Sequence, residues 1–440
     1  MPSISNEGIG MEETAAYVRK LIADVGGTAE ICPTQGYPVV YGEVNAGKEK
    51  TLLIYGMYDV QPVAGEQWIS PPFGAEIVEL DEFGKCVVCR GVFNSKGPLR
   101  GFFNVIALLR EMGDLPVNLK FVIEGEEEMG SKHLPDFILS NKDRLRADAV
   151  FFPFYSQNRS GKPILYLGCK GLVYLELACQ GSARGGPTSR DVHSSYAAWI
   201  SSPAWRLANA LAALVSPEEH ILVDGLTANA KPPSDEDEEL LNVLSKTFDA
   251  NVWLKEADAL RFKVDLNGKD LLRHYLFSPT ITIDGLSAGY EGPGMKTVLP
   301  HKATAKLDIR LVPGMTVADA LSRLKAHLSK HGFDDVGIEV LGSYGPSKVS
   351  VREPGVQALI AAYRHLGYDP EIWPMIGGSA PFYLFTEELG IPIIIGGLGH
   401  GGRAHSPNEY APVSGMKLYE KSVATYLYVF GADTRIRQMC

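Results

Sequence analysis

Three consecutive glutamates, Glu126, Glu127 and Glu128, are the residues of this sequence best placed to do chemistry. They follow the apolar run Phe121–Ile123, an order typical of a buried strand that delivers acidic side chains to the end of a sheet. Neighbouring carboxylates repel one another unless a cation, a shared proton or solvent offsets their charge. The stretch therefore predicts an acid–base or metal site or, as the alternative, a solvated acidic turn.

Two further stretches favour a site over a turn. The apolar run Leu52–Met57 leads into Asp59, so a second strand is expected to end in an acid. Downstream, His405 follows the glycine-rich run Gly396–Gly402. Carboxylates and imidazoles are the groups that acid–base catalysts and metal sites use, so these stretches reduce the weight of the acidic-turn alternative.

Composition excludes several classes of protein. A chain of 440 residues, 45% hydrophobic and 21% charged, predicts a globular protein of about two domains. A net charge of −10 without a cluster of lysine and arginine argues against nucleic acid or a membrane surface as the main partner. We find no membrane-spanning run and no signal peptide, and six scattered cysteines fit reduced thiols, so a cytoplasmic location is expected.

The first part of the chain alternates between strands and helices, which predicts an α/β sheet. The expected helices are Met11–Val25, Gly101–Met112 and a short one around Phe137–Ser140. The expected strands are Pro38–Tyr41, Thr51–Tyr55, Ala75–Glu79, Cys86–Val92, Pro116–Ile123 and Asp148–Phe152.

The pattern changes at about Gly171 and changes back after Ser347. Between these points, alternating strands and amphipathic helices predict an α+β sandwich, with the acidic stretch Pro232–Glu239 as an exposed linker or loop. We therefore predict an α/β catalytic domain with a central mixed sheet, formed by residues 1–171 and 347–440. An α+β domain, residues 172–346, is inserted into it. The expected elements are strands Leu172–Cys179, Thr280–Asp284, Thr304–Leu311 and Pro392–Ile395, and helices Ser201–Leu214, Val317–His331, Gly355–Leu366, Pro381–Leu389 and Gly415–Phe430.

The order of short motifs along the chain resembles that of the M20 family of metallopeptidases, and most closely its cytosolic dipeptidase and carnosinase branch. The motifs are GMYDVQP, RGVFNSKGPL, EGEEEMGS, DVHS, KTVLPHKATAKLDIRLVPGMT, GGSAP and AHSPNE, and they cover nearly the whole chain. The resemblance implies a hydrolase with a two-metal site between its catalytic domain and an inserted lid, which also forms a homodimer.

The residues that would bind the first metal ion depart from the family pattern. Met57 stands where the family has a histidine ligand, Asn94 where it has the bridging aspartate, and Phe154 where it has a carboxylate. A thioether is a poor ligand for such an ion and a phenyl ring has no ligand atom. We predict that the first metal site is lost, and that Met57 and Phe154 contact substrate or fill the vacated cavity, the latter expected for Phe154.

The second metal site is partly retained. Glu128 and His405 match its ligands, and Asn94 would add an amide oxygen. These three residues would hold one Zn²⁺ or Mn²⁺ ion with open positions. The alternative is that no metal binds and that Glu128 and His405 hydrogen-bond each other.

Other positions of the family's active site are kept. The resemblance implies that Glu127 is the general base and that Asp59 orients the site. His193 would reach into the partner subunit's site and stabilise developing negative charge. Arg310 would bind a substrate carboxylate, with Gly378 and Ser379 at the rim.

Three functions remain open from these residues. The first is a hydrolase that cleaves a C–N bond in a small, carboxylate-bearing substrate, with at most one metal ion and Glu127 as base. The second is a metal-independent enzyme that uses Glu127 for hydrolysis, elimination or proton transfer. The third is a non-catalytic protein that binds a small carboxylate through Arg310.

Overall fold

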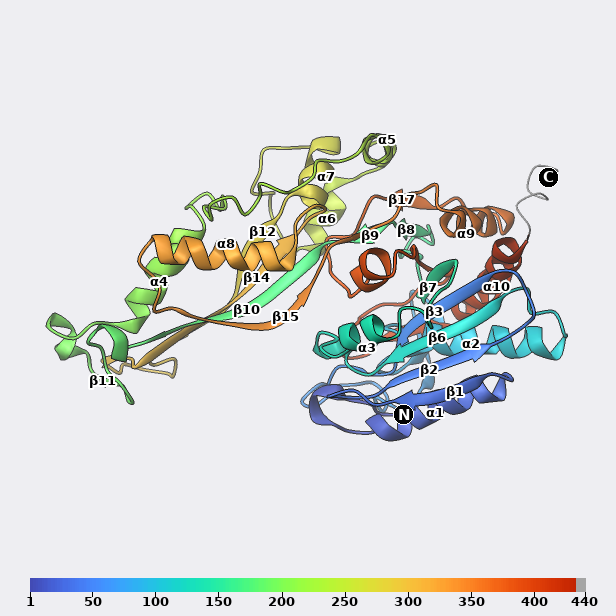
Figure 1. The fold of residues 1–440 in the computed structure, drawn as a ribbon, viewed down its shortest axis with the longest axis horizontal. Coiled ribbons are helices and arrows are strands. Elements are labelled where there is room, and N and C mark those ends of the chain that lie inside the picture. The colour runs from blue at the N-terminus through green and yellow to red at the C-terminus, as the bar shows by residue number, and fades with distance from the viewer. Residues whose placement is uncertain (433–440) are drawn as a thin grey trace.

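A mixed sheet of six strands occupies one end of the computed structural model, which describes residues 1–432 (Figure 1). The central strands β6, β3, β7 and β18 are parallel, while β1 and β2 add antiparallel pairs at one edge. The strands, in spatial order, are β1 (Thr28–Cys32), β2 (Val39–Val44), β6 (Asn118–Glu124), β3 (Thr51–Met57), β7 (Ala149–Pro153) and β18 (Ile393–Gly396). This arrangement confirms the predicted α/β fold with a central mixed sheet.

Both faces of the six-stranded sheet are covered, because its central strands are continuously apolar. Side chains on one face pack against four helices, and those on the other face pack against a short helix and a π-helical turn. The four helices are α1 (Met11–Asp24), α2 (Lys96–Glu111), α9 (Pro354–His365) and α10 (Val413–Gly431). The other face carries α3 (Leu134–Ser140) and the turn Leu384–Glu388, where sequence predicted a regular helix.

A second, fully antiparallel sheet has its own hydrophobic core. Its spatial order is β12 (Thr280–Ala288), β14 (Lys302–Leu311), β10 (Gly171–Gln180) and β15 (Gly337–Tyr344). Burial alternates along β10, because its odd-numbered side chains face α4 (Pro203–Leu214) and α8 (Val317–Lys330). In Figure 1 this sheet lies to one side of the six-stranded sheet, with α4 and α8 on its upper face.

The prediction of an exposed linker at Pro232–Glu239 was wrong. Residues Asp235–Leu244 form helix α5, and Leu241 and Leu244 on it are buried. Ser234 and Asp237 form a capping box that satisfies the first backbone amides, and the acidic first turn complements the helix dipole. Composition alone therefore gave a wrong prediction, because acidic residues also stabilise the first turn of a helix. Helices α6 (Ala250–Glu256) and α7 (Gly268–Phe277) complete this segment.

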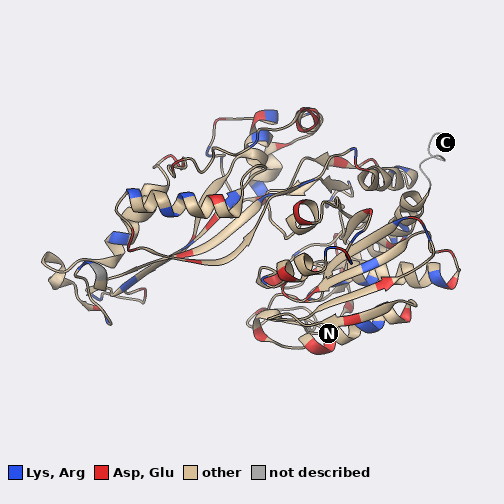
Figure 2. Ribbon diagram, in the orientation of Figure 1, with Lys and Arg blue, Asp and Glu red and all other residues tan. Residues whose placement is uncertain are grey.

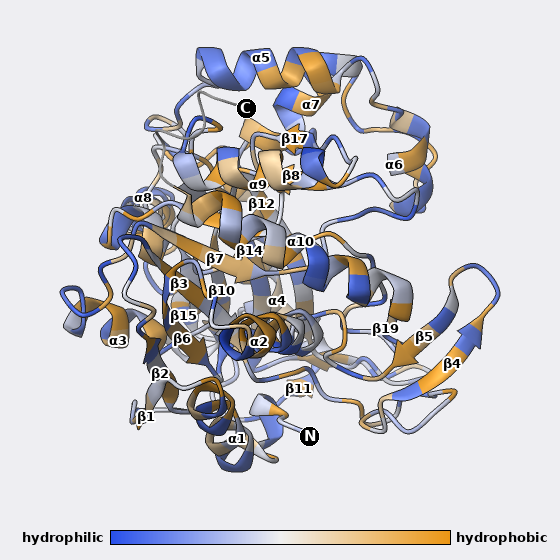
Figure 3. Cartoon of the chain, turned by 90° about the vertical axis from the view of Figure 1, so that its right-hand side faces the viewer, coloured by the Kyte–Doolittle hydropathy of each residue, from blue (hydrophilic) through white to orange (hydrophobic). Residues whose placement is uncertain are grey.

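The described residues also form four smaller sheets. They pair β4 (Glu76–Leu80) with β5 (Gly84–Val88) and β19 (Tyr410–Pro412), β8 (Ile164–Tyr166) with β17 (Glu371–Trp373), β9 (Gly168–Cys169) with β16 (Ser347–Lys348), and β11 (Val192–His193) with β13 (Val298–Leu299). Figure 3 shows the β4–β5 hairpin projecting from the molecule. Acidic and basic residues are interspersed along the ribbon (Figure 2). Within residues 1–432, no helix combines the length and apolar character needed to cross a bilayer.

Candidate active site

The register of β3 against β6 brings the acidic stretches together. Met57 pairs with Glu124 at the carboxyl ends of these parallel strands, so the residues that follow emerge at the same edge of the sheet. There the backbone amide of Glu128 donates a hydrogen bond of 3.0 Å to Asp59 Oδ2. Glu127 and Glu128 begin a short 3₁₀ turn, Glu127–Met129, directly beyond the strand.

Glu128 is the centre of a cluster of polar side chains. His405 Nε2 lies 3.0 Å from Glu128 Oε2, and Asn94 Nδ2 donates to Glu128 Oε1 over 3.1 Å. The same Asn94 nitrogen lies 3.0 Å from His405 Nε2. Gln61 Nε2 also donates to Glu128 Oε2, over 3.0 Å. The structure therefore brings together the three residues predicted to bind the second metal ion.

Glu409 positions Asn94, and sequence reasoning missed it. Its buried carboxylate accepts hydrogen bonds from the backbone amides of Gly91, Phe93 and Asn94, at 3.1, 2.9 and 2.9 Å. It also accepts one of 3.2 Å from the Arg90 guanidinium. One carboxylate thus ties the loop of Asn94 to the segment of His405. The only sequence signal for this role was the place of Glu409 in AHSPNE.

Burial shapes the acid–base behaviour of the site. Asp59 is fully buried, and this burial, together with the Glu128 carboxylate, raises the pKa of Asp59 to about 7. Burial and the neighbouring carboxylates of Glu128, Asp59 and Glu124 raise the pKa of Glu127 well above its usual range. The hydrogen bond to Glu128 raises the pKa of His405. A base whose pKa lies above that of an ordinary carboxylate is suited to proton transfer at neutral pH.

Arg310 links the two sheets. It lies on β14, and its Nη1 donates a hydrogen bond of 2.9 Å to Ser379 Oγ in the loop after β17. Its Nε lies 3.3 Å from Asp308 Oδ1. The carbonyl of Gly378 accepts a hydrogen bond of 3.0 Å from the backbone amide of Lys170. The three residues predicted to bind substrate at the rim therefore lie next to one another.

His193 lies far from these residues within one chain. It is exposed on β11 at the outer end of the four-stranded sheet, opposite the six-stranded sheet in Figure 1. There its Nδ1 lies 2.9 Å from Ser195 Oγ and its Nε2 3.0 Å from Thr297 Oγ1.

Met57 is buried, and Phe154 belongs to a group of aromatic side chains. Met57 is 1% exposed at the end of β3. The ring of Phe154 lies 5.1 Å from that of Phe93 and 6.2 Å from that of Phe152, measured between ring centroids. Phe93 directly precedes Asn94, so this aromatic group borders the polar cluster.

Residues 53–430 match the sequence profile described as Peptidase family M20/M25/M40. The chain belongs to this family. It is 28% identical to the Cys-Gly metallodipeptidase DUG1 of Candida albicans, over 90% of this chain and 81% of that protein. It is also 28% identical to the Beta-Ala-His dipeptidase of Rattus norvegicus, over 87% of this chain and 78% of that protein.

A solved M20 structure covers nearly the whole chain. The M20 family metallo-carboxypeptidase Sso-CP2 from Sulfolobus solfataricus superposes with a TM-score of 0.90 and 34% sequence identity, over 98% of this chain and 96% of that one. The two-sheet arrangement is therefore that of an M20 peptidase, and this M20 chain is a hydrolase of C–N bonds by family.

Among residues 1–432, no group of three or more His, Cys, Asp and Glu side chains is placed to hold a metal ion. Both carboxylate oxygens of Glu128 are occupied by hydrogen bonds from amide nitrogens of Asn94 and Gln61. A metal ion at this cluster would be held by Glu128, His405 and the amide oxygen of Asn94, and the Asn94 amide would have to turn over to offer that oxygen.

Proposed function

We propose that this M20 hydrolase cleaves a peptide or related C–N bond in a small substrate with a free carboxylate, using Glu127 as general base and one divalent metal ion at most. The observation that carries the proposal is the common sheet edge at which Asp59, Glu127 and Glu128 emerge, with His405 3.0 Å from Glu128. Relatives named as dipeptidases support a dipeptide as the substrate.

Each residue has a defined part in this reaction. Arg310, held by Ser379, binds the substrate carboxylate and so fixes the scissile bond beside the acids. Glu127 takes a proton from water and passes it to the leaving nitrogen. Asp59 orients the turn of Glu128 by accepting its amide hydrogen. An ion bound by Glu128 and His405 would supply Lewis-acid polarisation of the substrate carbonyl.

The position of His193 supports a homodimer through the inserted segment 172–346. An exposed histidine at the outer end of the four-stranded sheet serves catalysis only in the site of another copy. Its imidazole would stabilise negative charge on the carbonyl oxygen there. Mixing His193→Ala with Glu127→Gln subunits tests this: one active site per mixed dimer should be restored, whereas a monomeric enzyme would show no restoration.

A cytoplasmic location is part of the same proposal. The cysteines that the structure describes, Cys32, Cys86, Cys89, Cys169 and Cys179, are all free thiols, which suits a reducing compartment.

The decisive experiment combines turnover with metal analysis. We expect hydrolysis of dipeptides by protein supplied with Zn²⁺ or Mn²⁺, and a loss of about 10²–10⁴-fold in kcat for Glu127→Gln. Elemental analysis should give about one equivalent per chain, lost in His405→Ala. Binding of dipeptides without turnover in wild-type protein would instead support a non-catalytic role.

A metal-independent acid–base enzyme is the second candidate. The hydrogen bonds that occupy both oxygens of Glu128 favour it, because such a closed cluster needs no cation. Turnover that survives removal of all metal and still requires Glu127 would establish this alternative.

A further inference from the structure

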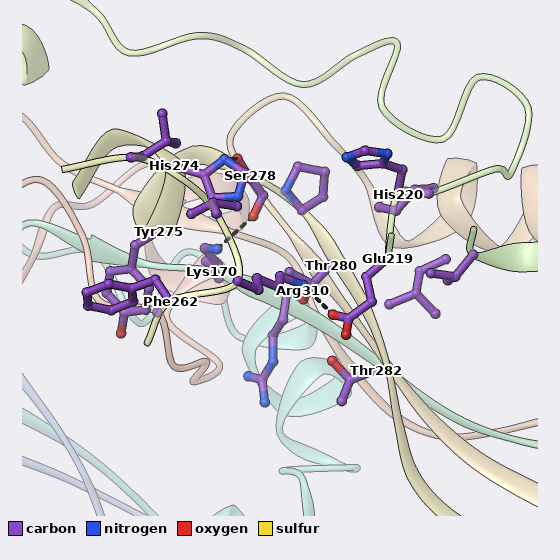
Figure 4. A pocket seen from close by; sticks show the side chains of 18 of the residues that line it. Lys170, Glu219, His220, Phe262, His274, Tyr275, Ser278, Thr280, Thr282 and Arg310 are labelled. Carbon is purple, nitrogen blue, oxygen red and sulfur yellow. Dashed lines mark hydrogen bonds and ion pairs between the residues drawn. The ribbon is translucent and has the colours of Figure 1, made fainter. Parts of the chain in front are cut away.

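A cavity of about 1300 Å³ is lined in part by Arg310. Residues of helices α6 and α7, the loop after α4 and strand β12 line it, together with Gly377. Lys170 and Arg310 also line it (Figure 4). Arg310, which would bind the substrate carboxylate, is therefore also part of the cavity wall. Its volume exceeds that of a typical small-ligand pocket.

Aromatic side chains form one wall of this cavity. Trp253 lies 5.5 Å from Trp373 and 5.7 Å from Tyr275, measured between ring centroids, and Phe248 lies 6.3 Å from Trp253. Phe262 lines the cavity as well. Such a wall favours a flat aromatic ligand, because ring pairs add stabilisation beyond the area they bury.

Lys170 is a buried cation in this apolar setting. It is 4% exposed, and its Nζ donates a hydrogen bond of 2.7 Å to the carbonyl of Ser278. The same nitrogen lies 5.8 Å from the Tyr275 ring centroid. Within residues 1–432, no carboxylate forms an ion pair with it. Burial and the like charge of Arg310 lower the pKa of Lys170 to about 8. An unpaired buried cation is costly, so a ligand anion beside it would be stabilising.

The charged groups of Lys170 and Arg310 contact different partners. The Arg310 guanidinium is directed to Ser379 and Asp308, whereas the Lys170 ammonium is directed to Ser278. Figure 4 shows the two charged groups pointing apart. Two separate cations, one at the rim and one inside, match a ligand with two separate acidic groups.

We propose that this cavity binds the residue on the carboxylate side of the scissile bond, and that it takes an aromatic side chain carrying an acidic substituent, which Lys170 binds. The main-chain carboxylate stays with Arg310. This inference rests on the proposed function only in assigning that carboxylate to Arg310.

Three dipeptides separate the contributions of ring and acid. We expect kcat/KM to be highest for glycyl-4-carboxyphenylalanine, and lower by at least about tenfold for glycyl-phenylalanine and glycyl-glutamate. Lys170→Met should abolish the preference for the carboxylated ring over phenylalanine, and Trp253→Ala should abolish the preference for it over glutamate. Lys325→Met, which removes an exposed lysine on α8, is the matched control and should keep both preferences. Equal effects of Lys170→Met on all three dipeptides would overturn the proposal.

A binding measurement separates this proposal from hydrolysis. Free 4-carboxyphenylalanine should bind the Glu127→Gln protein with a dissociation constant at least about tenfold lower than that of phenylalanine. Quenching of the fluorescence of Trp253 and Trp373 would measure both affinities. Lys170→Gln, whose amide keeps a donor near Ser278, should lose that difference even if Lys170→Met fails to fold. Such binding without any dipeptide turnover would uphold the cavity assignment and refute the hydrolase. Turnover with no difference in binding would do the reverse.

Discussion

His405 Nε2 lies 3.0 Å from Glu128 Oε2, and this contact joins an exposed side chain to a buried one. The His405 side chain is 51% exposed, whereas that of Glu128 is 3% exposed. The polar cluster is therefore open on the His405 side, which is where a metal ion or a substrate atom would enter.

Asn94→Asp should strengthen metal binding. Asn94 contacts both Glu128 and His405, so a carboxylate there adds negative charge between the two retained ligands. We expect Zn²⁺ to bind about tenfold more tightly, measured by competition with a chelating dye. Asn45→Asp, on an exposed turn, should leave the affinity unchanged. Weaker binding in Asn94→Asp would mean that the cluster is not a metal site.

Glu409→Ala should destabilise the fold and the site together. Removing this carboxylate leaves three backbone amides and part of the buried Arg90 guanidinium without an acceptor. We expect a loss of about 3 kcal/mol in the free energy of unfolding, measured with urea. Glu388→Ala, which breaks an exposed pair with Lys142, should cost less than about 1 kcal/mol. Equal costs would show that Glu409 does not hold the loop.

Glu124→Gln should change the pH dependence of stability. Burial raises the pKa of Glu124 from 4.5 to about 8, so the folded chain keeps a proton that the unfolded chain releases above pH 4.5. Its contribution to the free energy of unfolding is therefore complete below pH 4.5 and is lost as pH rises towards 8, by up to about 1.4 kcal/mol per pH unit. Glutamine stays neutral and its oxygen can accept the bonds from Tyr55 and Ser131.

The variant should therefore gain stability relative to wild type as pH rises from about 5 to about 8, in urea titrations at each pH. Glu388→Gln, at the surface, should run parallel to wild type. A constant difference between Glu124→Gln and wild type would contradict the raised pKa.

Ser234→Ala should weaken helix α5. Ser234 Oγ accepts the amide hydrogen of Asp237, and the Asp237 carboxylate accepts the amide hydrogen of Ser234. We expect a loss of about 1 kcal/mol in thermal or urea unfolding. Ser245→Ala, at the other end of this helix, should change stability by less than about 0.5 kcal/mol. No effect of Ser234→Ala would mean that the cap contributes nothing to the fold.

The sequence by itself determined the two sheet types and the acids at the strand ends. Apolar runs such as Phe121–Ile123 predict buried strands from composition, and alternation predicts one-sided burial along β10, because both follow from local periodicity. Local patterns can also mislead. The acidic composition at the start of α5 predicts a linker, because composition does not reveal the side-chain hydrogen bonds that cap this helix.

Only the tertiary structure decided which of these residues meet. The register of β3 against β6 aligned Asp59 with Glu128, and the fold brought Glu409 to the loop of Asn94 and Gln61 to Glu128. It also buried Lys170 beside an aromatic cavity, with no carboxylate among residues 1–432 in an ion pair with it. These relationships join residues far apart in the chain, so they depend on packing between elements, and no local pattern of residue types carries them.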